Sequence, residues 1–275
     1  PAKIIAVTGS NGKTTVTTLI EKILKTLGKG ESFACGNIGN PFSAVVHKIK
    51  KDDFVSLEVS SFQLERIADF KPKVSLILNF SPNHLDRYKN IQDYLSAKKR
   101  IFMNQDKNDY LVLNYNDPTL KELAKESKAT VVYFSETGDL NPNQAAVLTV
   151  GSILGVDKES ALSILREFKG IEHRMEHVSQ INDIKFINDS KSTTIDSAIW
   201  ALRNINSPVI LIAGGKDKGV DYKGILEFAR KKVKGLILIG EARQRIESSL
   251  GKFLPTEEAV SLEEAVCKAY RRASP

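Results

Sequence analysis

Short apolar runs recur along the chain and alternate with stretches that have helical spacing. Each run is continuous, as is typical of strands buried on both faces of a parallel sheet. The predicted strands lie at residues 4–7, 54–59, 74–80, 111–114, 130–134, 184–187, 209–213 and 235–240. The predicted helices lie at residues 13–24, 91–103, 119–128, 143–168 with a break at 155–157, 198–202 and 261–271. Strands that alternate with helices predict an α/β fold with a mainly parallel sheet covered on both faces.

Two regions interrupt this pattern. Residues 35–41 (Cys-Gly-Asn-Ile-Gly-Asn-Pro) are rich in turn-forming residues and predict a loop. Residues 170–176 are predicted to form a connector, after which a new series of strands and helices begins. We therefore predict two domains, residues 1–170 and residues 171–275.

The first predicted strand leads into a glycine-rich turn and then a helix. The turn, Thr-Gly-Ser-Asn-Gly at residues 8–12, is followed directly by Lys13, Thr14 and Thr15. Glycines let backbone N–H groups approach phosphates, and a helix N-terminus supplies partial positive charge. Lys13 can reach the terminal phosphates of a nucleotide, and the Thr14 hydroxyl can ligate Mg²⁺. The loop is shorter than the usual G-x-x-x-x-G-K-[ST], but strand, glycines, Lys-Thr and helix together predict a nucleotide site.

Polar residues follow two other predicted strands. Glu58 lies near the end of Phe-Val-Ser-Leu-Glu-Val, and His84 lies in the polar loop Ser-Pro-Asn-His-Leu-Asp-Arg-Tyr at residues 81–88. The carboxyl ends of parallel strands line the crevice where open sheets bind ligands. We predict that Glu58 holds a metal ion beside the phosphates and that His84 contacts Mg²⁺ or phosphate. The alternatives are a surface carboxylate and a capping or core histidine.

Composition narrows the class of protein. The 275 residues are 41% hydrophobic and 27% charged, which is typical of soluble globular proteins. Cys35 and Cys267 are far apart and in no metal-ligand pattern, so we expect free thiols in a reducing cytoplasm. The net charge of +7 comes from scattered lysines and arginines, which suits a solvated surface and polyanionic small substrates. We expect a cytoplasmic monomer with no membrane span, no secretory signal and no nucleic-acid partner.

Short motifs occur in one order along nearly the whole chain. They are T-G-S-N-G-K-T-T at 8–15, L-E-V-S-S-F-Q-L-E at 57–65, N-H-L-D-R-Y at 83–88, E-H-R-M-E at 172–176, N-D-S-K-S-T-T at 188–194 and A-G-G-K-D-K-G at 213–219. In this order the motifs resemble the Mur ligases, which join amino acids to a peptidoglycan precursor with ATP, and their folylpolyglutamate synthetase relatives. The resemblance implies a P-loop-type ATPase domain with a mainly parallel sheet, followed by a smaller Rossmann-like α/β domain.

The resemblance also implies roles at the ATP and metal sites. Lys13 would contact the β- and γ-phosphates of ATP. Thr14 and Glu58 would hold one Mg²⁺, and His84 would help to hold a second. Lys98 matches a lysine that is carbamylated in the family, and the resulting anion would orient the second metal ion. Lys13, His84 and Lys98 are therefore the predicted catalytic residues. The remaining predicted ATP contacts are Gly9, Asn11, Gly12, Thr15, Asn143, Arg174, Asp189 and Lys191.

Within the family, the motifs at 57–65, 83–88 and 188–194 resemble the members that add D-glutamate to UDP-N-acetylmuramoyl-L-alanine. By that resemblance, Thr193 and Lys218 would receive the carboxylates of D-glutamate. The other predicted substrate contacts are Asn37, Ser60 and His173. The substrate carboxylate would attack the γ-phosphate to give an acyl-phosphate, which the D-glutamate amine would then attack. Both steps gather negative charge, so cations act mainly by electrostatic stabilisation and positioning.

The chain differs from the family pattern in three places. It opens one residue before the first strand without the family's uridine-binding domain, residues 141–144 lack the histidine of the adenine-contacting H-N-x-x-N segment, and it ends before the family's last amino-acid-binding segment. We hypothesise that segments are missing near residues 28–32, 139–143 and 272–274; an intact mass of 30.4 kDa would contradict this. The alternatives are another Mur-type or folylpolyglutamate synthetase-like ligase, a catalytically incomplete nucleotide-binding fragment, and a nucleotide-dependent switch.

Overall fold

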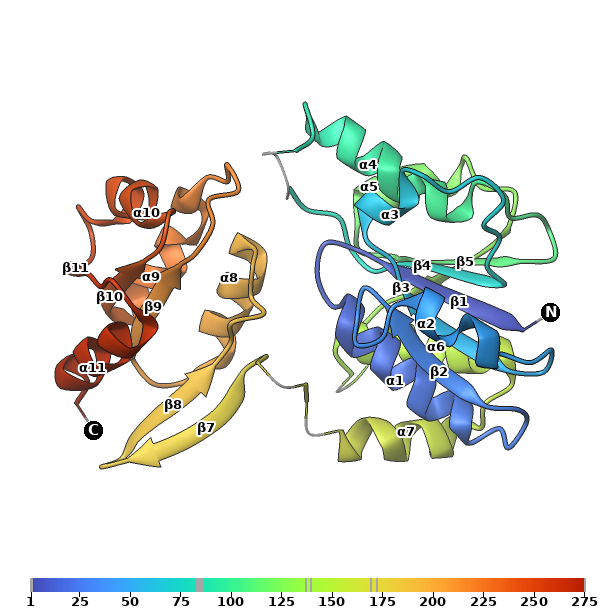
Figure 1. The fold of residues 1–275 in the computed structure, drawn as a ribbon, viewed down its shortest axis with the longest axis horizontal. Helices are drawn as coiled ribbons and strands as arrows, with labels where there is room; N and C mark the ends of the chain where they lie inside the picture. The colour runs from blue at the N-terminus through green and yellow to red at the C-terminus, as the bar shows by residue number, and fades with distance from the viewer. Residues whose placement is uncertain are drawn as a thin grey trace. The chain divides into compact units, whose positions relative to one another are not determined.

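Parallel strands form the centre of both parts of the chain. The computed structural model describes residues 2–82, 87–136, 138, 140–168, 170–171 and 173–274. The chain divides into two units, the first running from the N-terminus to Pro82 and from Tyr88 to Lys169, and the second from Gly170 to the C-terminus. In Figure 1 the first unit is coloured from blue to yellow-green and the second from yellow to red.

Within the described residues, the first unit is built on a six-stranded sheet with the order β2-β3-β1-β4-β5-β6. Every neighbouring pair in it is parallel. The strands are β1 (Lys3–Thr8), β2 (Ser32–Gly36), β3 (Phe54–Glu58), β4 (Val74–Ile77), β5 (Tyr110–Asn114) and β6 (Thr130–Phe134). Because β1 lies between β3 and β4, the loops that follow these three strands meet at one edge of the sheet.

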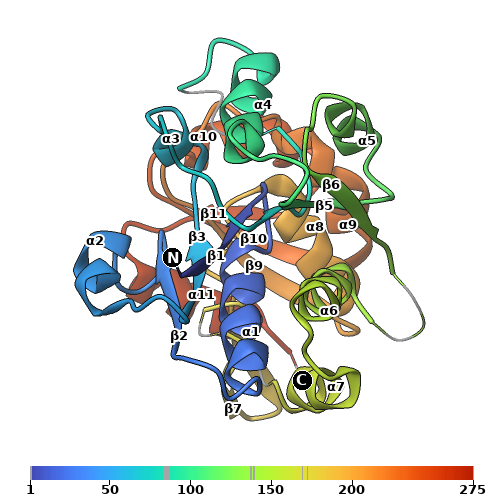
Figure 2. The same ribbon diagram turned by 90° about the vertical axis from the view of Figure 1, so that its right-hand side faces the viewer.

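Helices cover both faces of this sheet. Figures 1 and 2 show α1, α6 and α7 together on one face and α3, α4 and α5 on the other. The helices are α1 (Lys13–Lys25), α2 (Phe42–Val45), α3 (Ser61–Leu64), α4 (Ile91–Lys99), α5 (Pro118–Ala124), α6 (Pro142–Leu154) and α7 (Lys158–Glu167), with 3₁₀ turns η1 (Val46–Lys48) and η2 (Arg100–Phe102).

Side chains of the central strand β1 pack into two separate apolar cores, one on each face of the sheet. Ile5 and Val7 pack with Leu19 of α1 on one face of the sheet, whereas Ala6 packs with Ile101 of η2 on the other. Successive side chains of a strand point to opposite faces. A strand covered on both faces must therefore be apolar at every position, which is why its sequence shows a continuous run.

The second unit has a smaller parallel sheet, with the order β11-β10-β9, and a separate antiparallel hairpin of β7 and β8. Leu236 and Leu238 of β10 pack with Leu202 of α8 and Ile246 of α10. The elements are β7 (Glu176–Ile181), β8 (Ile184–Asn188), α8 (Ile195–Asn204), β9 (Val209–Gly214), η3 (Tyr222–Ile225), α9 (Leu226–Lys232), β10 (Val233–Ile239), α10 (Arg243–Leu250), β11 (Thr256–Glu258) and α11 (Leu262–Arg272).

The structure confirms the α/β fold and corrects several predicted bounds. Part of the loop predicted at 35–41 belongs to the edge strand β2, whose small residues gave a weak strand signal. Strand β4 ends at Ile77, because Asn79 pairs with the loop after β1 instead of continuing the sheet. The helix predicted to reach residue 103 ends at Lys99 and tightens into η2. Among the described residues, no helix combines the length and apolarity needed to cross a membrane.

Candidate active site

The loop between β1 and α1 takes a shape that requires glycine. Gly9 and Gly12 have φ angles of 153° and 84°, a region that side chains rarely tolerate. A Cβ on Gly12 would lie 2.5 Å from Oδ1 of Asn143, near the start of α6. The loop and the beginning of α6 are therefore in close contact, so the predicted ATP contacts Gly12 and Asn143 lie side by side.

The N-terminus of α1 is available to an anion. Gly12 is its N-cap, no side chain caps it, and its first turn holds no acidic residue. The first backbone N–H groups of a helix have no partner within the helix. Together with the helix dipole, they favour phosphate at this place. The predicted ATP contacts Lys13, Thr14 and Thr15 form the first turn of this helix.

Two lysines converge on one carbonyl oxygen of the loop. Lys13 Nζ donates hydrogen bonds to Gly9 O at 3.0 Å and to Ser10 O at 3.1 Å. Lys98 Nζ, at the end of α4, donates to the same Gly9 O at 2.8 Å. The structure thus brings together two of the three predicted catalytic residues. The third, His84, lies outside the described residues.

Lys98 is buried to an unusual degree for a lysine. Its exposed fraction is 1%, and its Nζ lies 4.6 Å from the centre of the Tyr94 ring. Burial, and then the nearby charge of Lys13, hold the pKa of Lys98 well below its usual range. The deprotonated amine is the nucleophilic form of lysine, and a lowered pKa increases the share of this form. Lys98 is therefore suited to covalent modification.

Glu58 is buried among neutral hydrogen-bond donors. Its exposed fraction is 3%. Its Oε2 accepts a hydrogen bond from Thr14 Oγ1 at 2.8 Å, and its Oε1 accepts one from Asn37 Nδ2 at 3.0 Å. No lysine or arginine in the described part of the chain forms an ion pair with Glu58. A buried carboxylate is costly unless a cation or further donors compensate it, so the arrangement suits a cation.

The described residues contain no cluster of three or more histidine, cysteine, aspartate or glutamate side chains that could hold a metal ion. Mg²⁺ is usually held by one or two carboxylates together with substrate phosphates and water. Glu58 and Thr14 supply a carboxylate and a hydroxyl oxygen beside the open end of α1. The residues present therefore fit one such ion.

The predicted substrate contact Ser60 caps helix α3. Its Oγ accepts a hydrogen bond from Gln63 N, and the side chain of Gln63 accepts one from Ser60 N in return. Ser60 lies two residues after Glu58, and Asn37 follows the neighbouring strand β2. Both residues therefore lie at the same edge of the sheet as the glycine loop.

In the second unit, Asp189 connects the loop after β8 to the segment before β7. Its Oδ1 accepts a hydrogen bond from Met175 N at 3.0 Å, and its Oδ2 accepts one from Ser192 Oγ. Arg174 lies next to Met175, and its Nε is buried and has no hydrogen-bond partner among the described residues. A buried donor without a partner costs free energy unless a ligand or water meets it. Arg174 and Asp189 are thus adjacent, and Arg174 has a donor to spare.

His173 and Lys191 belong to the same small cluster. Lys191 N donates to His173 O at 3.0 Å, and His173 Nδ1 lies 2.8 Å from Asn188 Nδ2. His173 and Met175 both have positive φ angles, 65° and 48°, a conformation that costs energy for residues other than glycine. Such backbone conformations often occur at ligand sites, so the segment around Arg174 is a plausible binding element.

Thr193 and Lys218 lie in two further loops of the second unit. Thr193 is exposed just before α8, and Lys218 is partly buried in the loop after β9. Asp217 holds this second loop, because its carboxylate accepts from Gly219 N at 3.0 Å and pairs with Arg245 at 2.9 Å. Desolvation would raise the pKa of Asp217, but the hydrogen bond from Gly219 and the charge of Arg245 outweigh it and lower that pKa.

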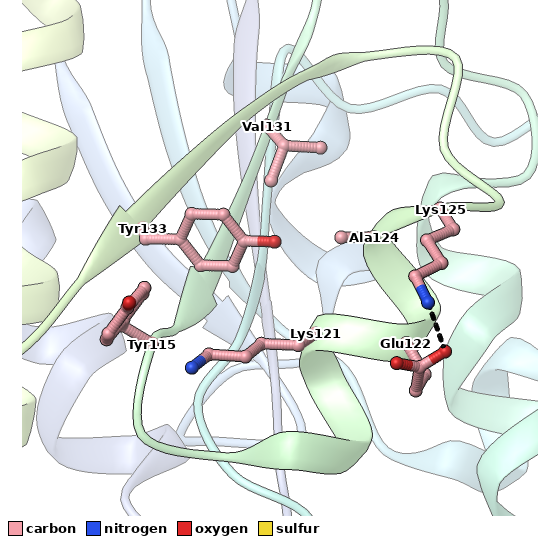
Figure 3. Close-up of a pocket in the computed structure, with 7 residues that line it drawn as sticks. All are labelled: Tyr115, Lys121, Glu122, Ala124, Lys125, Val131 and Tyr133. Atoms are coloured by element: carbon pink, nitrogen blue, oxygen red, sulfur yellow. Dashed lines mark hydrogen bonds and ion pairs between the residues drawn. The ribbon is translucent and has the colours of Figure 1, made fainter.

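Two surface hollows of the first unit are lined by residues that include no predicted site residue within the described part of the chain. The one in Figure 3, of about 510 Å³, lies between α5 and the edge strand β6. There Lys121 lies 3.7 Å from the centre of the Tyr115 ring, and Lys125 pairs with Glu122. The second, of about 540 Å³, includes Lys99 and Arg100 at the end of α4. The chemistry of the glycine loop is thus separate from both hollows.

Comparison with known proteins identifies the family of this chain. A Mur ligase middle domain matches residues 7–169, and a Mur ligase glutamate ligase domain matches residues 173–275. The chain belongs to the Mur ligase family. The division between the two matched domains falls in the connector that precedes β7.

Curated relatives of this Mur ligase chain are named UDP-N-acetylmuramoylalanine–D-glutamate ligase. The protein of Thermoanaerobacter sp. (strain X514) is 38% identical over 311 residues, which cover 99% of this chain and 68% of the relative. The protein of Geotalea daltonii is 40% identical over 306 residues, which cover 99% of this chain and 67% of the relative. Since these alignments are longer than the 275 residues here, the relatives carry residues within the matched region that have no counterpart in this chain.

Solved structures of Mur ligases and related enzymes share the fold. MurF ligase from Thermotoga maritima in complex with ADP matches with a TM-score of 0.79 at 18% identity, over 99% of this chain and 74% of that one. Bifunctional folylpolyglutamate synthase/dihydrofolate synthase from Yersinia pestis, complexed with AMPPNP and a manganese ion, matches with a TM-score of 0.74 at 17% identity, over 99% and 83% of the two chains. At these identities the likeness shows the fold.

Sequence reasoning missed several residues that shape the Mur ligase site. Ser10 belongs to the glycine loop and bonds to Ser81, Asn79 bonds to Asn11 of the same loop, and the Tyr94 hydroxyl lies 3.5 Å from Ser10 Oγ. Asp217 holds the loop that carries Lys218. Two of these had a usable signal. Ser10 lies inside the glycine motif, and Asn79 is the first polar residue after the apolar run of β4.

Proposed function

We propose that this chain carries the catalytic part of an ATP-dependent ligase that adds D-glutamate to UDP-N-acetylmuramoyl-L-alanine in peptidoglycan precursor synthesis. The observation that carries the proposal is the convergence of Lys13, Lys98, Thr14 and Glu58 around the glycine loop at the open end of α1. The names of the curated relatives supply the substrates. In this proposal the protein works on small molecules in the cytoplasm, as a monomer.

The glycine loop and α1 would hold the phosphates of ATP. The N–H groups at the start of α1 would face them, and Lys13 would exchange its hydrogen bonds to the loop carbonyls for bonds to the β- and γ-phosphates. Gly9 and Gly12 let the backbone come close, and Asn11 of the loop and Thr15 of the first turn of α1 would complete the phosphate contacts. Asn143 beside Gly12 would contact the adenine portion.

Two Mg²⁺ ions would take part, and the chain offers partners for both. Thr14 and Glu58 would hold the first, because they present a hydroxyl and a buried carboxylate oxygen within 2.8 Å of each other. His84 and Lys98 would hold the second, with Lys98 in its carbamylated form. Bound Mg²⁺ would supply charge neutralisation at the transferred phosphate.

Carbamylation of Lys98 would require a neutral amine and a site that tolerates an anion. Burial and Lys13 favour the neutral amine. Once modified, Lys98 carries a negative charge, and Lys13 can stabilise it at close range. Lys13 thus favours both the neutral amine of Lys98 that reacts and the anionic carbamate that forms from it.

The second unit would contribute further contacts to the substrates. Arg174, whose buried Nε has no partner in the described part of the chain, and Asp189 would contact the phosphates and ribose of ATP, with Lys191 and His173 beside them. Thr193 and Lys218 would bind the carboxylates of D-glutamate, and Asn37 and Ser60 in the first unit would contact the muramoyl substrate. The substrate carboxylate would then attack the γ-phosphate and displace ADP to give an acyl-phosphate. The amine of D-glutamate would attack the acyl-phosphate, and the amide would form with release of phosphate and a proton.

Phosphate release tests the proposal. The protein in its full natural length is assayed with ATP, Mg²⁺ and UDP-N-acetylmuramoyl-L-alanine, with D-glutamate, L-glutamate, L-alanine or D-alanyl-D-alanine added one at a time. We expect release with D-glutamate alone. Release with another amino acid would keep the mechanism and change the specificity. If no amino acid gives release, the ligase proposal is wrong and the loop serves binding or switching.

A further inference from the structure

The glycine loop is held from the side by the segment that follows β4. Ser10 N donates to Asn79 O at 3.1 Å, and Leu78 N donates to Thr8 O at 3.0 Å. These bonds join the segment after Ile77 to Thr8 and to the loop that follows it, next to the paired ends of β1 and β4. These hydrogen bonds therefore constrain the backbone path of the loop after Thr8.

Asn79 extends this pairing with its side chain. Its Oδ1 accepts a hydrogen bond from Asn11 N at 2.9 Å, and its Nδ2 donates one to Asn11 O at 3.1 Å. A carboxamide has one acceptor and one donor side by side, so it can bind the backbone N–H and C=O of one residue, as a neighbouring strand would.

Ser10 fixes the other side of the same turn. Its Oγ donates to Ser81 O at 3.0 Å and accepts from Ser81 N at 2.9 Å, and its exposed fraction is 5%. Ser10 N and Ser10 Oγ are therefore hydrogen-bonded to neighbouring protein, and so is the N–H of Asn11. The backbone N–H groups proposed to face phosphate are those at the start of α1, from Gly12 onward.

We propose that Asn79 is a positioning residue that sets the phosphate-binding shape of the glycine loop through its two hydrogen bonds to Asn11. The proposal rests on the use of ATP by this site. If Asn79 is removed, Asn11 loses two hydrogen bonds, and the peptide between Asn11 and Gly12 is held less firmly. The N–H groups of the following residues then point less well at phosphate, and affinity for the phosphate part of the nucleotide falls.

Binding of AMPPNP and of adenosine to the full-length protein separates loop positioning from general damage. Asn79→Ala should weaken AMPPNP binding about 10-fold, as expected for the loss of two neutral hydrogen bonds. Its affinity for adenosine, which has no phosphate, should stay within about twofold of wild type. Asn104→Ala is the matched control, because the Asn104 carboxamide donates to Ala68 O and Phe70 O, and neither residue belongs to the loop. The control should bind both ligands as wild type does.

Asn79→Asp adds a second measurement that does not depend on the alanine variant being folded. The ionised aspartate keeps the acceptor for Asn11 N but places an oxygen against Asn11 O, so AMPPNP binding weakens. A protonated carboxyl group again offers one acceptor and one donor. The ratio of variant to wild-type dissociation constants should therefore fall as pH is lowered.

Three results would overturn the proposal. They are unchanged AMPPNP affinity in Asn79→Ala, equal weakening of AMPPNP and adenosine, and a pH-independent ratio for Asn79→Asp. The binding measurements involve no amino acid. A wild-type protein that binds AMPPNP but releases no phosphate with D-glutamate would contradict the proposed function and leave the role of Asn79 intact.

Discussion

Lys98 and Lys99 are neighbours on α4 but lie in opposite surroundings. Lys98 is buried and donates to Gly9 O, whereas Lys99 forms a surface ion pair with Glu126 at 2.7 Å. A surface pair of this kind contributes little to stability. Variants of these two neighbours therefore test whether activity needs the buried amine of Lys98 or only a lysine on α4.

We expect Lys98→Ala to lower kcat about 100-fold or more, since it removes the anion proposed to orient the second Mg²⁺. Acetate or formate should restore part of the activity, because a small carboxylate can occupy the space of the carbamate. Phosphate release with and without added carboxylate measures both effects. Lys99→Ala should stay within about twofold of wild type. Full activity in Lys98→Ala would remove this residue from the site.

Lys218 offers a second test at the scale of one residue. Lys218→Ala should raise KM for D-glutamate about 10-fold, as expected for loss of a hydrogen bond to a charged group. KM for ATP should change by less than about twofold. The exposed Lys216, in the same loop, provides the control as Lys216→Ala. Steady-state kinetics with each substrate varied in turn give the comparison, and equal changes in both KM values would contradict the assigned role.

At the scale of elements, the strength of the sequence pattern decided what could be predicted. Strand β6 has the predicted bounds, 130–134, because its five residues are all apolar, aromatic or β-branched. Strand β7 was not predicted, since Glu176–Ile181 is largely polar and four of its six residues are exposed in a hairpin. Strand β8 was predicted, but its pairing with β7 instead of the main sheet depends on contacts that no local pattern reveals.

Three strands of the first unit are tied together at their starting ends by Asp53. Its Oδ1 accepts a hydrogen bond from Glu31 N at 2.8 Å and its Oδ2 accepts one from Lys50 N at 2.6 Å. Its own carbonyl accepts from Lys3 N at 2.9 Å. The backbone hydrogen bond from Lys50, followed by that from Glu31, lowers the pKa of Asp53 below its usual value.

This lowered pKa predicts an acid-sensitive junction. Because the folded-state pKa is lower than that of the unfolded chain, the carboxylate stabilises the fold above about pH 4, and this contribution is lost as pH falls through the folded-state value. Asp53→Asn should lower the melting temperature at pH 7 and reduce its dependence on pH between about 5 and 3. The exposed neighbour gives the control, since Asp52→Asn should leave both unchanged. An identical pH dependence in Asp53→Asn and wild type would contradict this role.

At the scale of the whole molecule, the sequence was most informative about the parts of the site that lie in continuous motifs. Lys13, Thr14 and Glu58 were placed at strand ends by local pattern alone, and the structure brings them together. Lys98 entered only through family resemblance. Asn79 was missed because its partner Asn11 is 68 residues away in sequence, so the pairing exists only once β1 and β4 are adjacent. Long-range pairing of this kind is a property of topology.

The buried carboxylate of Glu58 has a consequence for the stability of the first unit as a whole. A cation that binds only the folded protein raises its unfolding free energy by RT ln(1 + [L]/Kd), about 2.7 kcal/mol at 100 times Kd. The melting temperature should therefore rise with Mg²⁺ concentration in the presence of nucleotide, even when no amino acid is supplied and no turnover occurs. Glu58→Gln should be less stabilised by Mg²⁺ because it removes the charge, and its own melting temperature should be equal to or above that of metal-free wild type. The melting temperature would thus report how much of the protein has bound Mg²⁺ in the absence of turnover.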